Sequence, residues 1–251
     1  MPGLSFITLL AYDYYYAFDT ISSYYDIADE IILGVDADRL TWMGQPFFFD
    51  LDAVRAFIQQ IDAAGKIRIV EGNFHAGDDP SRNETDERCE LSRLCAAGNW
   101  IVQIDCDEVL LNPAEFKQWL LANDPNSAVA AQLLTVFKRF GNQLLIVTPA
   151  DEGVPVATRI PGQYTGSRWS EEKHVNSPLQ LLHFSWGRTA DELRQKLNNW
   201  GHALQVDREG FYQLWESVTL ENYQQVHNFH PIESKRWKSL TVATIQRSQS
   251  G

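Results

Sequence analysis

Short apolar runs alternate with amphipathic stretches along the first part of the chain. The runs are rich in β-branched and aromatic residues, which predicts strands over residues 5–10, 30–35, 67–70 and 100–104. Between them, apolar residues return at helical spacing, which predicts helices over residues 14–25, 51–64 and 84–97. Asp50 is the expected N-cap of the second helix, and Gly65 and Gly98 are expected to end the second and third. This alternation predicts a parallel, right-handed sheet with helices on both faces.

The pattern changes after residue 105. A helix is expected over residues 113–122, and β-rich runs at 128–139 and 143–148 flank a turn, which predicts an antiparallel hairpin. Residues 149–178 are rich in loop-forming residues, and 179–184 is a further predicted strand.

The last part of the chain predicts one long helix. Leu193, Leu197, Trp200 and Leu204 follow helical spacing from a start near Thr189. We expect residues 231–251 to form a tail without regular structure. The predicted fold class is therefore α/β, with a Rossmann-type, mostly parallel sheet flanked by helices, a small antiparallel β region and C-terminal helices. All of it is expected to form one domain.

Composition narrows the class of protein. The chain has 251 residues, of which 44% are hydrophobic and 22% charged, as in ordinary soluble proteins. No apolar run approaches the roughly 18 residues of a membrane span, and we expect neither a transmembrane segment nor a signal peptide. Cys89, Cys95 and Cys106 suit neither a disulfide framework nor a zinc site, so we expect a reducing, cytoplasmic setting. The net charge of −12 argues against nucleic acid as a partner.

The predicted strand at 100–104 stops at three acids, Asp105, Asp107 and Glu108. Carboxylates buried at the end of an apolar strand need a compensating charge, either a divalent cation or an arginine. Oxygen ligands favour Mg²⁺ or Mn²⁺ over zinc. The simpler alternative is that Asp107 or Glu108 caps a following helix. The carboxyl end of a central strand is, however, where open α/β sheets bind their ligands, which favours the metal.

Residues 98–110, GNWIVQIDCDEVL, together with Arg88 on the preceding helix, resemble a pattern of family-2-type glycosyltransferases with the GT-A fold. The segments SFITLLAYD at 5–13 and DEIILGVDAD at 29–38 are similar to the first two strands of that family. The resemblance covers residues 4–112. Beyond that, it rests on the order of the elements.

The resemblance implies a nucleotide-sugar donor. Its base and ribose would lie near Tyr12, Asp36 and Asp38, and a metal on Asp105 and Asp107 would bridge its diphosphate. Residues 1–112 would bind the donor, residues 113–230 would face the acceptor, and 231–251 would be the tail.

Two features of the sequence depart from the family pattern. In the family, asparagine usually follows the arginine, but here Cys89 follows Arg88. An arginine followed by asparagine does occur six residues earlier, at Arg82 and Asn83, so either Arg82 or Arg88 faces the donor. The usual proline after the first strand is also absent. Arg88 near a helix N-terminus has three interpretations: it neutralises a phosphate, pairs with an aspartate of the strand end, or forms a surface pair with Glu84.

A histidine often completes the metal site in this class, and His183, at a predicted strand end, is our choice over His174. His227 and His230 have helical spacing but no neighbouring acid, which favours a structural part. An inverting transfer needs a base, for which Glu171 and Glu172 are the candidates, in a polar loop with the aromatic Trp169.

The sequence therefore predicts a metal-dependent glycosyltransferase that uses a UDP-sugar rather than a GDP-sugar and a carbohydrate or other hydroxyl acceptor, with inversion. Three alternatives remain: a haloacid-dehalogenase-like phosphatase with Asp105 as nucleophile and Asp107 as general acid, an inactive sugar-nucleotide-binding module, and a nucleotidyltransferase. The last usually has a glycine-rich basic phosphate loop, which the first strand region lacks. The sequence does not predict an oligomeric state.

Overall fold

The first four strands form a parallel sheet. The computed structural model describes residues 2–123, 126–233 and 235–245. Its strand order here is β3-β2-β1-β4, and all neighbours are parallel. The bounds are β1 Leu4–Leu10, β2 Glu30–Asp36, β3 Ile67–Gly72 and β4 Trp100–Gln103. The prediction of a parallel sheet from the apolar runs is confirmed, and β1, apolar at most positions, is buried along its whole length.

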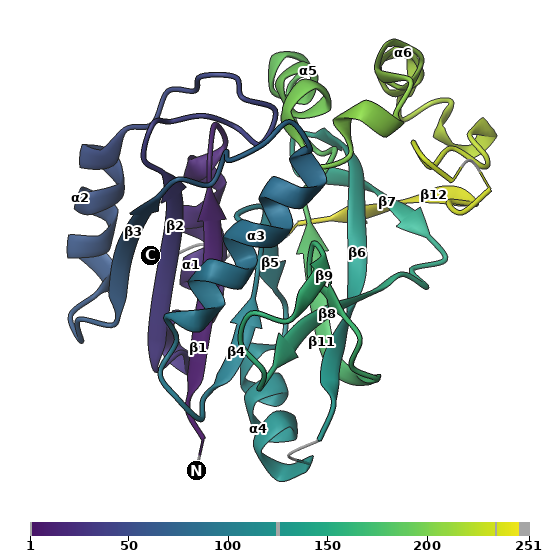
Figure 1. Ribbon diagram of the computed structural model, residues 1–251. Helices are drawn as coiled ribbons and strands as arrows, with labels where there is room; N and C mark the ends of the chain where they lie inside the picture. The colour runs from purple at the N-terminus through teal and green to yellow at the C-terminus, as the bar shows by residue number, and fades with distance from the viewer. Residues whose placement is uncertain (1, 124–125, 234, 246–251) are drawn as a thin grey trace.

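Helices cover both faces of this parallel part (Figure 1). Their bounds are η1 Tyr14–Tyr16, α1 Ala17–Tyr24, η2 Tyr25–Ile27, α2 Leu51–Ile61 and α3 Pro80–Arg93. Tyr24 of α1 stacks on Phe6 of β1 at 4.3 Å between ring centroids, on the face that α2 also covers. On the opposite face, Leu91 of α3 packs where Gly34 has no side chain, since a Cβ there would lie 2.3 Å from Leu91 Cδ1.

The caps fix where two of these helices start. Asp50 accepts a hydrogen bond from the backbone nitrogen of Ala53, so the predicted N-cap of α2 is confirmed. Helix α3 begins at Pro80, before the predicted start, because Asp79 accepts from the backbone nitrogens of Ser81 and Arg82 and proline suits the first helical position.

Beyond β4 the sheet continues with antiparallel neighbours, in the order β4-β8-β6-β7-β12. Strand β11 pairs in parallel with β6 and antiparallel with β5, and β9 with β10 form a separate two-stranded sheet. The bounds are β5 Glu108–Leu110, α4 Pro113–Asn123, β6 Ala128–Phe140, β7 Gln143–Thr148, β8 Gly153–Thr158, β9 Tyr164–Gly166, β10 Trp169–Ser170 and β11 His174–His183. The predicted fold class and hairpin are confirmed.

The C-terminal part differs from the prediction. Helix α5 spans Ala190–Asn199 and ends before Leu204, because the backbone of Trp200 turns to an extended conformation. A helix that the sequence did not predict, α6 Arg208–Ser217, follows between the short turns η3 Ala203–Gln205 and η4 Tyr223–Gln225.

The expected C-terminal tail contains a strand. Within 231–251, β12 Ser239–Thr244 pairs antiparallel with β7, so the expectation of no regular structure there is wrong for these residues. Residues 246–251 lie outside the described part of the chain.

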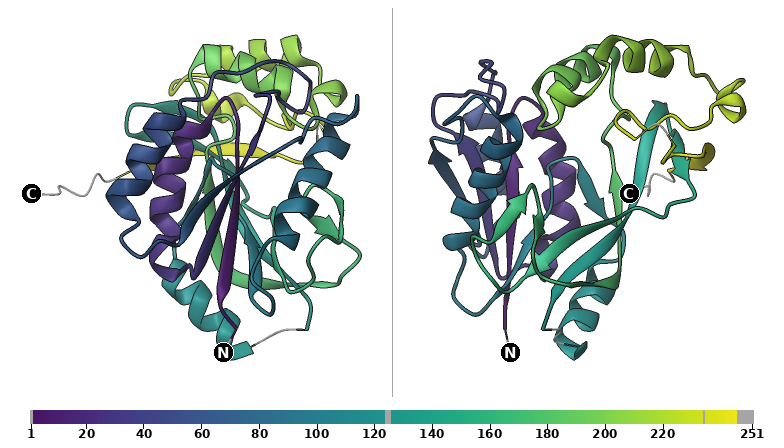
Figure 2. Two further views of the ribbon diagram at one scale, coloured as in Figure 1. Left: turned by 60° about the vertical axis from the view of Figure 1, so that its left-hand side comes forward. Right: turned by 45° about the vertical axis from the view of Figure 1, so that its right-hand side comes forward.

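A second apolar core joins α5 and α6 to the antiparallel strands. Phe137 of β6, Leu193 of α5 and Trp215 of α6 belong to it. As a result α5 lies across the top of the sheet, between the parallel and antiparallel parts (Figure 2). Within the described residues, no helix is long and apolar enough to cross a membrane. The domain boundaries at 112 and 230 stay predictions.

Candidate active site

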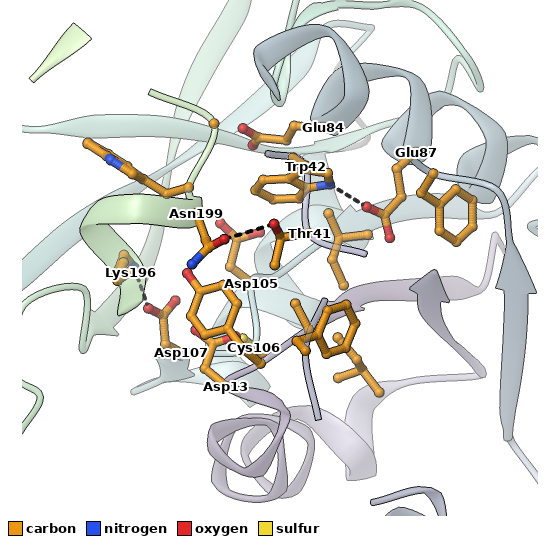
Figure 3. Close-up of a pocket in the computed structure, with 18 of the residues that line it drawn as sticks. Asp13, Thr41, Trp42, Glu84, Glu87, Asp105, Cys106, Asp107, Lys196 and Asn199 are labelled. Carbon is orange, nitrogen blue, oxygen red and sulfur yellow. Dashed lines mark hydrogen bonds and ion pairs between the residues drawn. The ribbon is translucent and has the colours of Figure 1, made fainter. Parts of the chain in front are cut away.

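A cavity of about 220 Å³ lies beyond the carboxyl ends of the parallel strands. Its lining includes the end of β1 with the residues that follow, the loop after β2, part of α3, the turn 105–107, the end of β11 and the end of α5 (Figure 3). This is the edge of an open α/β sheet where ligands bind. The predicted site edge therefore carries a real cavity, which we call the donor cavity.

The turn Asp105-Cys106-Asp107 is held from three sides. The Cys106 carbonyl accepts from Thr20 Oγ1 at 2.7 Å, and the backbone nitrogen of Asp105 donates to Glu108 Oε2 at 2.8 Å. The backbone nitrogen of Phe184, after β11, donates to the Asp107 carbonyl at 2.8 Å. Neither Asp107 nor Glu108 caps a helix, since Glu108 opens β5.

Arginines compensate the carboxylate of Asp105. Its Oδ1 accepts from Arg88 at 2.8 Å, and Arg168 lies 3.6 Å from its Oδ2. Burial alone would raise the pKa of Asp105, but Arg168 and Arg88 outweigh it and lower that pKa to about 2. Asp105 is therefore ionised at neutral pH, with its charge balanced by the protein.

The carboxylate of Asp107 is even more tightly held. Its Oδ2 accepts from Arg188 at 2.6 Å and from Lys196 Nζ at 2.8 Å, and its Oδ1 lies 3.5 Å from His183 Nε2. Burial raises the pKa of Asp107, while Lys196, His183 and Arg188 together hold it well below its usual range. Arg188 also donates to Asp13 at 2.7 Å, which makes it a bridge between the first strand and the turn.

The predicted ligands Asp105, Asp107 and His183 do not assemble into a three-ligand metal site. The described residues contain no group of three or more His, Cys, Asp or Glu side chains able to hold a metal ion. The reason is that arginines face both oxygens of Asp105 and two cations occupy one oxygen of Asp107. Asp107 Oδ1 and His183 Nε2 remain. Asp107 supplies the kind of ligand that Mg²⁺ commonly takes, which is one or two carboxylates plus substrate phosphates.

His183, and not His174, lies in the donor cavity. The two residues begin and end the same strand, so about 30 Å of strand separates them. Nδ1 of His183 is buried and has no hydrogen-bond partner in the part of the chain that the structure describes. His174 instead contacts Trp169, with 5.0 Å between their rings.

Of the two candidate arginines, Arg88 lies at the site. Its side chain is buried, and besides Asp105 it donates to Glu84 Oε1 at 2.9 Å and to Gln103 Oε1 at 3.3 Å. Arg88 therefore pairs both with an aspartate of the strand end and with Glu84, which were two of the three interpretations of its role. The Glu84 pair lies in the interior, whereas a surface pair had been expected. Arg82 is exposed and pairs with Asp86 on α3.

The residues expected around base and ribose fall into three groups. Tyr12 lines the donor cavity, and burial raises its pKa well above the usual value. Asp36 also lines it, but its two oxygens accept four backbone N–H groups, from residues 38, 40, 74 and 75, which occupy the lone pairs of a carboxylate. Asp36 therefore holds two loops together rather than binding a ribose hydroxyl. Asp38 is exposed and does not line the cavity.

The loop after β2 crosses the cavity. Trp42 Nε1 donates to Glu87 Oε2 at 2.7 Å, and Thr41 Oγ1 donates to Asn199 Oδ1 of α5 at 2.8 Å (Figure 3). Burial, the largest cause, raises the pKa of Glu87 to about 8. Trp42 therefore covers the cavity while its indole is held by a carboxyl group that is largely protonated at neutral pH.

The candidates for the base lie elsewhere. Glu171 is exposed, and Glu172 accepts from Thr158 Oγ1 at 2.5 Å. Neither lines the donor cavity, because both follow the small sheet of β9 and β10. His227 and His230 lie near the C-terminal strand and also do not line it.

Sequence reasoning missed three cations of the site, namely Arg168, Arg188 and Lys196. It did infer that the acids need a positive partner, and Arg188 follows His183 closely in sequence. What it lacked was the fold, since Lys196 reaches Asp107 across 89 positions. Arg168 likewise donates to both oxygens of Glu108, each at 2.7 Å, over 60 positions.

No model of a known protein family matches the chain, and no curated protein sequence matches it. Among solved structures it is similar to a 4-diphosphocytidyl-2C-methyl-D-erythritol synthase, with 11% identity and a TM-score of 0.34 over 62% of this chain and 74% of the other. It is also similar to a 2-C-methyl-D-erythritol 4-phosphate cytidylyltransferase from Francisella tularensis, with 11% identity and a TM-score of 0.31 over 85% of this chain and 87% of the other. A third similar structure is a mannose-1-phosphate geranyltransferase from Thermus thermophilus, with 9% identity and a TM-score of 0.28 over 88% of this chain and 67% of the other. These values are too low to carry anything about function.

Proposed function

We propose that the protein is a glycosyltransferase that binds a nucleoside-diphosphate sugar in the donor cavity and transfers the sugar to a hydroxyl group. One observation carries the proposal. The Asp105-Cys106-Asp107 turn ends a central parallel strand and faces a cavity that also holds Lys196 and His183. Acidic and cationic groups converge around this turn, and aromatic side chains line the same cavity along the loop after β2.

The lining of the cavity offers groups to both parts of such a donor. Tyr12, Trp42, Phe47 and Phe74 offer apolar surface to a base. Among the described residues, the ammonium group of Lys196 has a single hydrogen-bond acceptor, Asp107, so donors remain for a diphosphate oxygen. A uridine nucleotide is the expected donor, and GDP is the comparison.

A divalent cation belongs to the proposal. Asp107 and His183 would hold Mn²⁺ or Mg²⁺, and the ion would neutralise charge on the departing diphosphate. The chain's own part is to keep Asp107 ionised and oriented, which Arg188 and Lys196 do by fixing its second oxygen.

The phosphatase alternative is weaker on the same evidence. A phosphatase nucleophile must be free to attack phosphorus. Asp105 instead directs its oxygens at Arg88 and Arg168, and these two charges hold it as a counter-ion.

A thermal-shift titration with UDP and GDP, each with and without Mn²⁺, tests the proposal. A ligand at about 100 times its Kd stabilises the native state by about 2.7 kcal/mol. We expect UDP with Mn²⁺ to raise Tm, and expect the rise to shrink in both Asp107→Asn and Lys196→Met. Lys173→Met, an exposed lysine outside the cavity, is the matched control and keeps the full rise. No rise with either nucleotide in the native protein contradicts the proposal.

A further inference from the structure

A second cavity, of about 340 Å³, adjoins the donor cavity. It lies among residues of β6 and β8, Trp169 of β10, and the segment that leads to β12. Four residues line both cavities: His183, Ser185, Trp200 and His202. The two cavities therefore adjoin one another, and the residues that they share include His183, which faces Asp107.

The lining of the second cavity is aromatic. Trp169, Trp186, Trp200 and Trp237 all contribute to it. Trp169 is 44% exposed although it is a large apolar side chain, so its indole surface is available to a ligand. Indole rings pack well against the C–H face of a sugar ring, because they combine a broad apolar surface with little conformational freedom.

Polar groups accompany these rings. Glu152 is fixed by Trp237 Nε1 and by Arg236, each at 3.3 Å. His230 Nδ1 accepts from the backbone nitrogens of Ile232 and Glu233, at 3.2 and 2.9 Å, so its neutral ring carries the proton on Nε2. The cavity thus offers carboxylate acceptors beside guanidinium and imidazole donors, the pairing that sugar hydroxyls require.

The charge of the lining selects among acceptors. Of the described lining residues, Glu152 and Glu233 are acidic and Arg236 is the one permanent cation. The excess of negative charge would repel a phosphorylated or carboxylated acceptor, whereas a neutral sugar would not be repelled.

We infer that the second cavity is the acceptor subsite, and that it takes a neutral sugar whose ring packs on Trp169 and whose hydroxyl groups bond Glu152 and Arg236. This inference rests on the proposed function, because the acceptor hydroxyl must reach the donor sugar, and the four shared residues place the second cavity directly beside the donor cavity.

Saturation-transfer NMR on the native protein, with UDP and Mn²⁺ present, tests the inference. The probes are the methyl β-glycosides of glucose, galactose and N-acetylglucosamine, with glucose 6-phosphate as the charged comparison. We expect at least one methyl glycoside to bind and glucose 6-phosphate not to bind. In Trp169→Ala and Glu152→Gln, we expect glycoside affinity to fall about tenfold, the loss of one good aromatic or polar contact.

The controls separate this inference from the function on which it rests. Phe48→Ala removes an aromatic side chain that is 76% exposed and outside both cavities, and it should keep native glycoside binding. The UDP-induced rise in Tm should persist in Trp169→Ala. Absence of glycoside binding, or equal binding in Trp169→Ala, overturns the acceptor subsite while the UDP response still stands. Absence of the UDP response in the native protein overturns the proposed function itself.

Discussion

Buried charge is the dominant feature at the scale of single residues. Asp105, Asp107 and Glu108 lie together after β4, and each faces at least one cation from another part of the chain. The sequence allowed the inference that these acids need a positive partner, because an unpaired buried carboxylate is costly. It did not allow the partners to be named, since a contact between distant residues leaves no local pattern.

The Arg168 to Glu108 pair gives the first prediction. Both side chains are buried, so Arg168→Met leaves Glu108 without its counter-ion and should cost about 3–5 kcal/mol of unfolding free energy. Urea denaturation measures this. The double variant Arg168→Met with Glu108→Gln should recover a large part of the loss, and a single variant as stable as the native protein would falsify the pairing.

Glu87 gives a prediction on pH. Its pKa in the folded protein is about 8, against an ordinary value of 4.5, so between these pH values the folded state holds a proton that the unfolded state has released. Stability from this group is therefore complete at low pH and declines as pH rises through this window, by at most about 1.4 kcal/mol per pH unit. Glu87→Gln should flatten that decline in urea denaturation between about pH 5 and about pH 8. An unchanged slope would show that Glu87 is ionised in the folded state.

At the scale of elements, helix α5 connects the second core to the site. Its apolar residues Leu193 and Leu197 are buried, while Lys196 and Asn199 reach the donor cavity. The sequence predicted its start near Thr189 correctly, because the cap and the apolar spacing are local. It misplaced the end, because Leu204 continues the spacing by chance and is 66% exposed in a later turn.

The capping box of α5 gives a third prediction. Thr189 Oγ1 accepts from the Glu192 nitrogen, and Glu192 Oε2 accepts from the Thr189 nitrogen at 2.8 Å. Thr189→Ala should therefore cost about 1 kcal/mol of unfolding free energy. UDP affinity, measured by calorimetric titration, should change little because Lys196 and Asn199 lie in later turns. A large loss of affinity would mean that the first turn of α5 positions the cavity.

The strands show the same contrast between local and distant information. β1 to β4 are apolar runs bounded by turns, and all four were predicted. β12 is a strand of six residues, of which three are apolar, and it completes the sheet by pairing with the edge of β7. Such an edge becomes visible only when the whole sheet is assembled.

At the scale of the whole molecule, the parallel part of the sheet, the antiparallel part and α5 meet around the two adjoining cavities. The parallel part, with its acidic turn, was predictable because its strands and helices alternate regularly. The position of His183 was predicted from its place at a strand end, whereas Arg188, Lys196 and the second cavity needed the three-dimensional structure. What the sequence did not reveal are mostly contacts between the parallel part of the sheet and the later part of the chain, such as those of Arg188 and Lys196 with Asp107.

A crystal structure of the protein soaked with UDP and Mn²⁺ tests the central claim most directly. The account predicts uracil against Trp42 and Phe74, and the diphosphate within hydrogen-bond distance of Lys196, with Mn²⁺ against Asp107 and His183. Nucleotide bound at another surface, or an empty donor cavity at saturating UDP, would contradict it.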